Sequence, residues 1–345
     1  MTTGHPLLSR FWNCYTLLAA FIVILFFNLW TFHGTGFQIL HHAPIAPSTA
    51  PPMLAPPEPT IPELEQEAPP AVPATHAVEE YKGIPRKLWY KLGPHGMSDE
   101  IRDWTKTCID SNPGYEVMLM TGESGDDMVK RVFASRPDIV EDYLALPIPI
   151  FKADILRYVM LYDQGGVWSD LDISCEGVPI DEWVPEEHRE TADLVVGWEF
   201  DWGWPGKFVR QFASWTIMSK KGSTHMMQVI DDIFETLHQK LVEHNVTVKD
   251  VTLEMMGDVV DFSGPRRLTT GVYKSLSKQL NQTIGEDDLS KILQPKLVGD
   301  VLVMPGRSFA ASSNTYMEEE EAQMPPKLVQ HHYAGSWKNE KGGED

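Results

Sequence analysis

The chain has 345 residues, 42% of them hydrophobic, so it can form one large domain or two small ones around a substantial core. Its formal net charge is -20 and no cluster of Lys and Arg is visible. This disfavours nucleic acid as a partner, because phosphate backbones are bound by such clusters. Three cysteines are too few for a disulfide-built scaffold, and Cys108 and Cys175 are open to two interpretations, a disulfide or two free thiols.

Residues 11–32 form an almost unbroken apolar and aromatic run. At about 1.5 Å per residue, a helix of this length crosses a bilayer core of about 30 Å. No small-residue cleavage site closes the run, so we expect a retained anchor rather than a signal peptide. Arg10 precedes the run and no Lys or Arg follows it before Lys82, which predicts a cytosolic tail at 1–10 and a single-pass type II membrane protein.

After the anchor, the composition changes twice. Residues 44–73 are rich in Pro and Ala without any apolar period, so 33–80 are expected to form an extended stem. A folded lumenal domain is expected over 81–345. Asn245 and Asn281 each begin an Asn-x-Thr sequence, the acceptor pattern for N-glycosylation in a lumenal domain.

The folded domain is predicted to alternate strands and helices. In chain order, the patterns predict a strand at 84–89, a helix at 99–110, a strand at 115–120, a helix at 150–162, a strand from 167 that continues into 169–172, strands at 194–198 and 215–219, a helix at 225–241 and a strand at 298–304. This order is typical of an α/β fold with a mainly parallel sheet. In such folds the site lies at the carboxyl ends of the strands.

Asp170 and Asp172 are the main catalytic candidates. If the strand from 167 continues through them, their side chains point the same way while Leu171 faces the core. Two carboxylates on one face suit Mn²⁺ or another hard divalent cation, whose remaining positions are filled by phosphate oxygens and water. An Asp-x-Asp sequence alone is common in acidic turns, so the surrounding sequence has to distinguish a metal site from an ordinary turn.

Upstream, Asp154 and Arg157 are three residues apart on the predicted helix and share a face. One interpretation is a surface ion pair of little energetic weight. The other is that Asp154 accepts hydrogen bonds from sugar hydroxyls while Arg157 neutralises a diphosphate. Gly165 ends the helix, and Gly166 allows the tight turn toward the two aspartates and is grouped with the substrate-binding residues.

The run from Lys152 to Asp172 resembles the DXD glycosyltransferases of family 32, most closely the fungal initiation-specific α-1,6-mannosyltransferases of the early Golgi. Further blocks of resemblance follow the same order, at 84–87, 211–220, 263–269, 299–305 and 331–338. The resemblance implies a GT-A fold, in which a Rossmann-like mixed α/β sheet is flanked by helices. It also implies GDP-mannose as sugar donor, Mn²⁺ as cofactor and retention of anomeric configuration.

Carried over to this sequence, the resemblance implies that Asp170 and Asp172 contact the nucleotide and the metal, and that Asp154 and Arg157 contact the donor sugar. One of two adjacent histidines is implied as a further metal ligand.

These histidines are His331 and His332, and a buried structural pair is the other interpretation of them. Trp89 and Tyr90, at the end of the first strand, are candidates for stacking on guanine. Buried core aromatics are the alternative for both.

The hypothesis is a Golgi membrane mannosyltransferase that moves mannose from GDP-mannose to the N-linked glycan core of a glycoprotein, alone or in a complex with other Golgi mannosyltransferases. One alternative is a mannosyltransferase acting on inositol-phosphoceramide or on another glycan. A second is a non-catalytic, membrane-tethered subunit that binds glycans. The loop after Trp198, with Trp202 and Trp204, is expected to stack on acceptor sugar rings.

Overall fold

The computed structural model describes residues 82–201, 210–335, 338 and 342–343, within the compact unit Thr75–Asp345. The predicted tail, anchor and stem, and the tryptophans Trp202 and Trp204, lie outside these residues. Among the described residues, no helix combines the length and apolarity needed to cross a bilayer.

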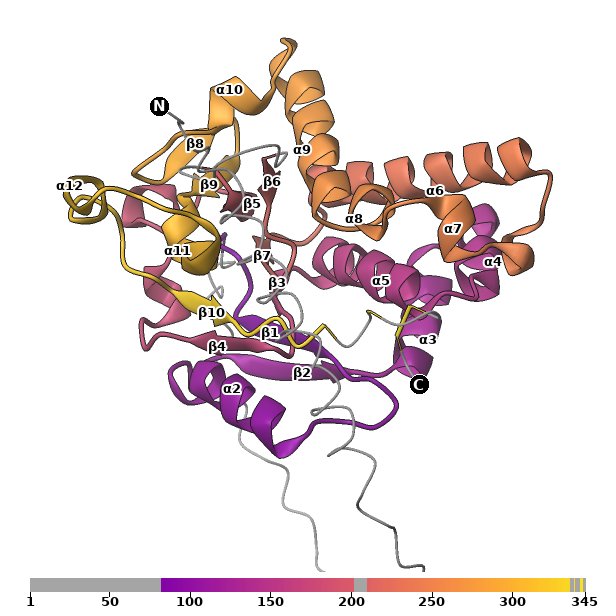
Figure 1. Ribbon diagram of the computed structural model, residues 1–345, viewed down its shortest axis with the longest axis horizontal. Helices are drawn as coiled ribbons and strands as arrows, with labels where there is room; N and C mark the ends of the chain where they lie inside the picture. The colour runs from indigo at the N-terminus through magenta and orange to yellow at the C-terminus, as the bar shows by residue number, and fades with distance from the viewer. Residues whose placement is uncertain (1–81, 202–209, 336–337, 339–341, 344–345) are drawn as a thin grey trace, which may run out of the picture. The chain divides into compact units, whose positions relative to one another are not determined.

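An eight-stranded mixed sheet forms the centre of the domain (Figure 1). In spatial order its strands are β2 (Glu116–Met120), β1 (Lys87–Lys91), β3 (Gly166–Ser169), β7 (Thr216–Ser219), β5 (Leu194–Phe200), β9 (Val301–Met304) and β8 (Lys296–Val298), with β6 (Gln211–Phe212) paired to β5. β2, β1 and β3 are parallel, β7 runs antiparallel between β3 and β5, and β5 is parallel to β9. The carboxyl ends of β1, β3 and β5 therefore lie at one edge of the sheet.

Helices cover both faces of this sheet (Figure 1). One face packs against α3 (Gly122–Val132), α4 (Pro137–Ala145), α5 (Pro149–Gln164), α6 (Thr224–His244) and α9 (Pro265–Leu280). The other packs against α2 (Asp99–Asp110), α11 (Gly306–Ala310) and a ribbon of β4 (Ile173–Cys175) and β10 (Val329–His331). Side chains alternate between the two cores, so Trp89 faces α5 while Leu88 and Tyr90 face away from it.

Short elements complete the described chain. They are the helices α7 (Leu253–Met256), α8 (Val259–Phe262), α10 (Glu286–Leu289) and α12 (Glu318–Glu321), and the 3₁₀ turns η1 (Ile180–Glu182), η2 (Glu186–His188), η3 (Val248–Asp250) and η4 (Ala311–Ser313).

Most predicted elements are confirmed, with two corrections to single elements, and the sheet is mixed rather than mainly parallel. The helix at 99–110 is α2, whose N-cap Ser98 accepts a hydrogen bond from the backbone of Ile101. The strand predicted at 298–304 is instead a hairpin of β8 and β9, because Gly299 turns the chain with a φ of 60°.

The second correction concerns the aspartates. β3 ends at Ser169, and Asp170 to Asp172 form a turn into β4 rather than a continued strand. The backbone N–H of Ile173 closes this turn by donating to the carbonyl of Asp170 at 3.2 Å. Strict alternation of side chains therefore does not orient Asp170 and Asp172.

Cys108 of α2 and Cys175 of β4 form a disulfide, which decides between the two interpretations left open by the sequence. Asn245 and Asn281 are exposed and end α6 and α9 in the left-handed conformation. That exposure leaves both side chains accessible, and their glycosylation stays a prediction.

Candidate active site at the carboxyl edge of the sheet

A chain of charges, of which Asp154 and Arg157 are buried and Asp170 is partly buried, links α5 to the end of β3. Arg157 Nη2 donates to Asp170 Oδ1 at 3.1 Å, and Arg157 Nη1 lies 3.0 Å from Asp154 Oδ1. Asp154 and Arg157 are only 3% and 6% exposed, so the alternative of a surface ion pair is wrong. The hydroxyl of Ser263 donates to Asp154 Oδ2 at 2.7 Å, and burial raises the pKa of Asp154 against the opposing effect of Arg157.

Asp170 is oriented by two groups. Its Oδ1 also accepts a hydrogen bond from Trp168 Nε1 at 2.6 Å, and the Arg157 guanidinium lies 5.2 Å from the centre of a Trp168 ring. A buried guanidinium held by two carboxylates and an indole has little freedom to move. The carboxyl edge of β3 thus presents a fixed positive charge next to Asp170.

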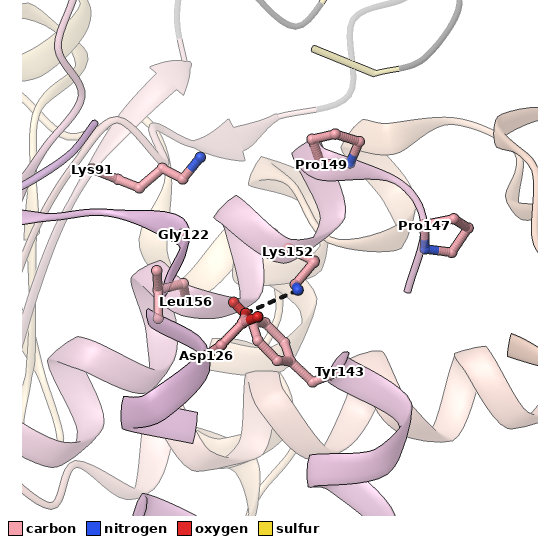
Figure 2. Close-up of a pocket in the computed structure, with 8 residues that line it drawn as sticks. All are labelled: Lys91, Gly122, Asp126, Tyr143, Pro147, Pro149, Lys152 and Leu156. Carbon is pink, nitrogen blue, oxygen red and sulfur yellow. Dashed lines mark ion pairs between the residues drawn. The ribbon is translucent and has the colours of Figure 1, made fainter. Parts of the chain in front are cut away.

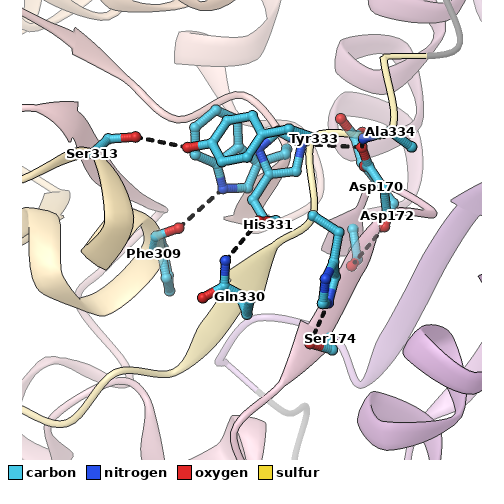
Figure 3. Close-up of polar contacts among 12 residues, drawn as sticks. Asp170, Asp172, Ser174, Phe309, Ser313, Gln330, His331, Tyr333 and Ala334 are labelled. Atoms are coloured by element: carbon cyan, nitrogen blue, oxygen red, sulfur yellow. Dashed lines mark hydrogen bonds and ion pairs between the residues drawn. The ribbon is translucent and has the colours of Figure 1, made fainter. Parts of the chain in front are cut away.

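Asp172 and His331 meet on the other side of the turn (Figure 3). His331 Nε2 lies 3.2 Å from Asp172 Oδ2, and the backbone N–H of Ala334 donates to the same oxygen at 3.0 Å. The ladder between β4 and β10 sets this approach, because it pairs His331 with Ile173. Although burial opposes the effect, the contact with His331 lowers the pKa of Asp172, so this carboxylate is ionised at neutral pH.

The two histidines face different neighbours. The His331 ring stacks on Trp215 at 4.2 Å and contacts the Tyr333 ring at 4.0 Å. The His332 ring stacks on Trp104 of α2 at 4.2 Å, and its Nε2 lies 2.8 Å from the hydroxyl of Ser174. Of the two predicted ligands, only His331 is placed beside an Asp side chain.

The ligand atoms at this edge fit a divalent cation. Asp172 and His331 offer a carboxylate and an imidazole side by side, as Mn²⁺ accepts. Within the described chain, His331 Nδ1 is buried and has no hydrogen-bond partner. Asp170 stands at the start of the same turn, with its carboxylate directed to Arg157.

A second group of possible metal ligands lies at the opposite edge of the sheet. Asp193 and Asp300 precede β5 and β9, and His225 belongs to the first turn of α6. Ligand atoms of the three residues all lie within 4.8 Å of one another, and His225 Nε2 is 2.8 Å from Asp300 Oδ1. The trio could hold a cation, and its present contacts join the start of α6 to the sheet.

Three further predicted site residues are structural in this arrangement. Trp89 and Tyr90 are buried, and Trp89 Nε1 donates to the carbonyl of Gly165 at 2.8 Å. Neither ring has a face free for guanine, so the core alternative holds. Gly166 has a φ of +106°, and a Cβ there would lie 2.7 Å from the Lys87 carbonyl oxygen, so close strand packing requires glycine.

Sequence reasoning missed Glu199, a buried acid near the end of β5. It lies at the register shift between β5 and β6, where Gln211 Nε2 donates to its Oε2 at 2.7 Å. Burial raises its pKa to about 7. The only sequence signal is a Glu within the apolar strand Leu194–Phe200.

A cavity of about 120 Å³ also opens beside the end of β1 (Figure 2). Lys91, Asp126 and Lys152 line it together with the ring of Tyr143 and the side chain of Leu156. Lys152 and Leu156 belong to the run that carries the family resemblance, but the sequence did not group them with Lys91, Asp126 and Tyr143, because the five residues come from four separate elements.

Comparisons with known proteins agree on one family. Residues 98–190 match the family described as glycosyltransferase sugar-binding region containing DXD motif. The initiation-specific alpha-1,6-mannosyltransferase of Candida albicans is 30% identical over 291 residues, which is 76% of this chain and 74% of that protein. The protein of the same name in Schizosaccharomyces pombe is 26% identical, over 76% of this chain and 66% of that protein.

A shorter similarity involves inositol phosphoceramide mannosyltransferase 3 of Schizosaccharomyces pombe. It is 40% identical over 70 residues, which is 20% of this chain and 19% of that protein. By contrast, the matches to the Candida albicans and Schizosaccharomyces pombe initiation-specific enzymes cover 74% and 66% of those proteins.

Proposed function

The chain belongs to the DXD-containing glycosyltransferases of family 32, and on this premise we propose that it is a retaining mannosyltransferase that uses GDP-mannose. One observation carries the proposal. The charged series Asp154–Arg157–Asp170 and the pair Asp172–His331 converge on the turn after β3. Such a cluster of fixed charges is what binding and cleaving a sugar diphosphate requires.

Each residue has a distinct proposed task. Arg157, held by two carboxylates, places a positive charge beside the diphosphate without reorganisation during the reaction. Asp154 accepts hydrogen bonds from hydroxyls of the donor sugar, and Asp170 keeps Arg157 in place. Asp172 and His331 would hold a divalent cation, proposed as Mn²⁺, which supplies charge to stabilise the leaving diphosphate.

The proposed acceptor is a mannose of an N-linked glycan core. Its support is the extent of similarity to two proteins named initiation-specific alpha-1,6-mannosyltransferase. A GT-A assignment fits the mixed sheet with helices on both faces. A type II anchor at 11–32 completes the proposal and rests on the charge distribution around the apolar run. The proposed Golgi location and association with other Golgi mannosyltransferases rest on the family resemblance.

A different acceptor, inositol-phosphoceramide, has weaker support, since the similarity to a protein of that activity covers only 20% of this chain. A non-catalytic glycan-binding subunit is the third hypothesis. The four charged residues Asp154, Arg157, Asp170 and Asp172 disfavour it. A protein that only binds glycans does not need an arginine held by two carboxylates beside a cation site.

A nucleotide-release screen tests the proposal. The full chain in detergent is incubated with GDP-mannose, UDP-glucose, UDP-galactose and UDP-N-acetylglucosamine, each with Mn²⁺ or with a chelator, and released nucleotide is measured. We expect release from GDP-mannose alone, dependent on Mn²⁺ and lost in Asp172→Asn. N-glycan and glycolipid acceptors then identify the acceptor class, and a chain that binds glycans without releasing nucleotide would support the non-catalytic hypothesis instead.

A further inference from the structure

Asp193, His225 and Asp300 meet at the edge of the sheet opposite the candidate active site. Leu194 of β5 pairs with Val301 of β9 in parallel, so the residues just before them, Asp193 and Asp300, lie side by side. The backbone N–H of Asp193 donates to the carbonyl of Asp300 at 2.7 Å, which fixes this approach. Residues at the same level of neighbouring strands direct their side chains to the same face, so the two carboxylates converge.

His225 completes the trio from the first turn of α6. Its side chain is fully buried, and its Nε2 lies 2.8 Å from Asp300 Oδ1. Nδ1 of the same ring is also buried and has no hydrogen-bond partner among the described residues. The hydroxyl of Ser223, which precedes α6, donates to Asp193 Oδ2. One ligand atom from each member of the trio lies within 4.8 Å of the other two, so small side-chain rotations bring all three around one ion.

The two carboxylates of the trio lack a balancing ion pair with a basic side chain. Within the described part of the chain, no Lys or Arg lies within ion-pair distance of Asp193 or Asp300. Lys220 attracts Asp193 from a distance, but its ammonium group donates to the carbonyl of Glu190 at 2.5 Å. Carboxylates this close repel each other, and a divalent cation between them removes the repulsion. The side chain of Asp300 is 31% exposed, which leaves a path for an ion to enter.

The ligand types of the trio select the kind of ion. One imidazole with two carboxylates suits Zn²⁺, which proteins bind through nitrogen and oxygen atoms in four-coordinate sites. The exposed side of the trio leaves the fourth position to water. Ca²⁺ and Mg²⁺ favour oxygen ligands alone and fit less well. For the same ligands, affinity is higher for Zn²⁺ than for Mn²⁺.

The trio is remote from the candidate active site. Leu194 is level with Ser219 of β7, which in turn is level with Gly166 at the start of β3. From residue 166 to Asp170 the chain advances about 13 Å along the strand direction. An ion held by the trio therefore cannot touch the turn after β3. Because α/β enzymes place their reactions at the carboxyl ends of strands, a site at the amino ends of β5 and β9 has a structural task.

We infer that Asp193, His225 and Asp300 bind Zn²⁺, and that this ion ties the start of α6 to the starts of β5 and β9. It is a second metal site, distinct from the proposed Mn²⁺ site at Asp172 and His331. Its ligands come from three separate segments of the chain, so binding stabilises the folded state alone. The inference is independent of mannose transfer.

The test uses the full chain in detergent, stripped of metal, with Asp172→Asn as background so that the proposed Mn²⁺ site is disabled. Asp193→Asn and Asp300→Asn are each added to this background. Both substitutions remove a charge and keep the side-chain shape and an oxygen that accepts hydrogen bonds. Asp231→Asn is the matched control, because Asp231 lies on α6 and its side chain is 46% exposed. Calorimetry with Zn²⁺ or Mg²⁺ gives stoichiometry and affinity, and thermal unfolding is followed with each ion and with a chelator.

The background variant should bind one Zn²⁺ per chain and unfold at a higher temperature with Zn²⁺ than with chelator, whereas Mg²⁺ should not have this effect. Asp193→Asn and Asp300→Asn should each weaken Zn²⁺ binding at least about a hundredfold, since loss of even an outer partner of a metal ligand weakens binding by about ten- to a hundredfold. In chelator both should unfold at the same temperature as the background or higher, because the repulsion is gone. Asp231→Asn should match the background with and without Zn²⁺.

Three results would overturn the inference. Zn²⁺ that leaves the unfolding temperature of the background unchanged would show that the trio holds no ion. Equal Zn²⁺ affinity in the background and in Asp193→Asn would place the ion on other groups. If Asp193→Asn and Asp300→Asn lowered the unfolding temperature equally in chelator and in Zn²⁺, the trio would be a hydrogen-bonded network without a metal.

Discussion

Adjacent residues of one chain can have unrelated tasks when a strand directs their side chains to opposite sides. His331 lies next to Asp172, whereas His332 packs on Trp104. We expect His331→Asn to weaken Mn²⁺ binding at least about tenfold, since even the outer partners of metal ligands contribute that much. His332→Asn should leave the metal affinity unchanged and lower stability by about 1 kcal/mol through loss of stacking. A Mn²⁺ titration that found equal losses in both variants would contradict this assignment.

Glu199 should make stability depend on pH. Burial raises its pKa from 4.5 in the unfolded chain to about 7. Between these two values the folded state binds more protons than the unfolded state, so stability falls as pH rises from about 4.5 to about 7 and the loss persists at higher pH. Glu199→Gln removes this penalty and should gain up to about 3 kcal/mol relative to the wild type at pH 8, but little at pH 4.

Urea unfolding at the two pH values, without metal, measures the Glu199 effect. Glu141→Gln on the exposed side of α4 is the control for losing a glutamate. Parallel pH curves for the wild type and Glu199→Gln would show that the buried carboxyl does not titrate in this range.

At the scale of elements, the junction of α5 and β3 keeps Asp154 and Arg157 of α5 in contact with Asp170 after β3. Gly166 opens β3 with a φ of +106°, and any Cβ would meet the Lys87 carbonyl oxygen at 2.7 Å. We expect Gly166→Ala to destabilise the fold by more than about 1 kcal/mol, because both the conformation and the space are unsuitable. The control is Gly114→Ala, where nothing lies within 4 Å of the added atom. Denaturant unfolding of both variants checks the difference, and equal midpoints would refute the steric argument.

Elements with local signals were predictable from the sequence. Ser98 and the acidic first turn mark the start of α2, and the apolar run of β5 marks a buried strand. The turn at Asp170 to Asp172 was not, because the backbone N–H of Asp170 donates to the carbonyl of Trp215, far along the chain. The local Asp-x-Asp pattern cannot reveal a partner contributed by the segment before β7.

The sequence identified most residues of the candidate site but not how they come together. Asp154, Arg157, Asp170 and Asp172 stand in one motif, so the sequence identified them together. Their convergence with His331 required the pairing of β4 with β10, which no local pattern encodes. Helix α3, which supplies Asp126, was missed because Gly122 and Gly125 in its first half are poor helix formers and read as a loop.

At the scale of the whole described domain, one covalent bond connects its layers beside the site. The disulfide of Cys108 and Cys175 joins α2 to β4, which follows directly after the turn with Asp172. It also holds Trp104 of α2 near its stacking partner His332. Loss of this bond should therefore affect both global stability and the ribbon that carries His331.

Reduction of the disulfide is expected to lower the free energy of unfolding by about 4 kcal/mol, because the bond closes a chain segment with a sequence separation of 67 and so restricts the unfolded state. Thermal or urea unfolding with and without a thiol reductant measures this. The double variant Cys108→Ser/Cys175→Ser should unfold like the reduced wild type and be insensitive to reductant. If reductant left the wild type unchanged and the variant was as stable as the oxidised protein, the disulfide would not contribute to stability.

We also expect the reduced protein to bind Mn²⁺ less tightly than the oxidised protein, because β4 and β10 then position Asp172 and His331 without the covalent link to α2.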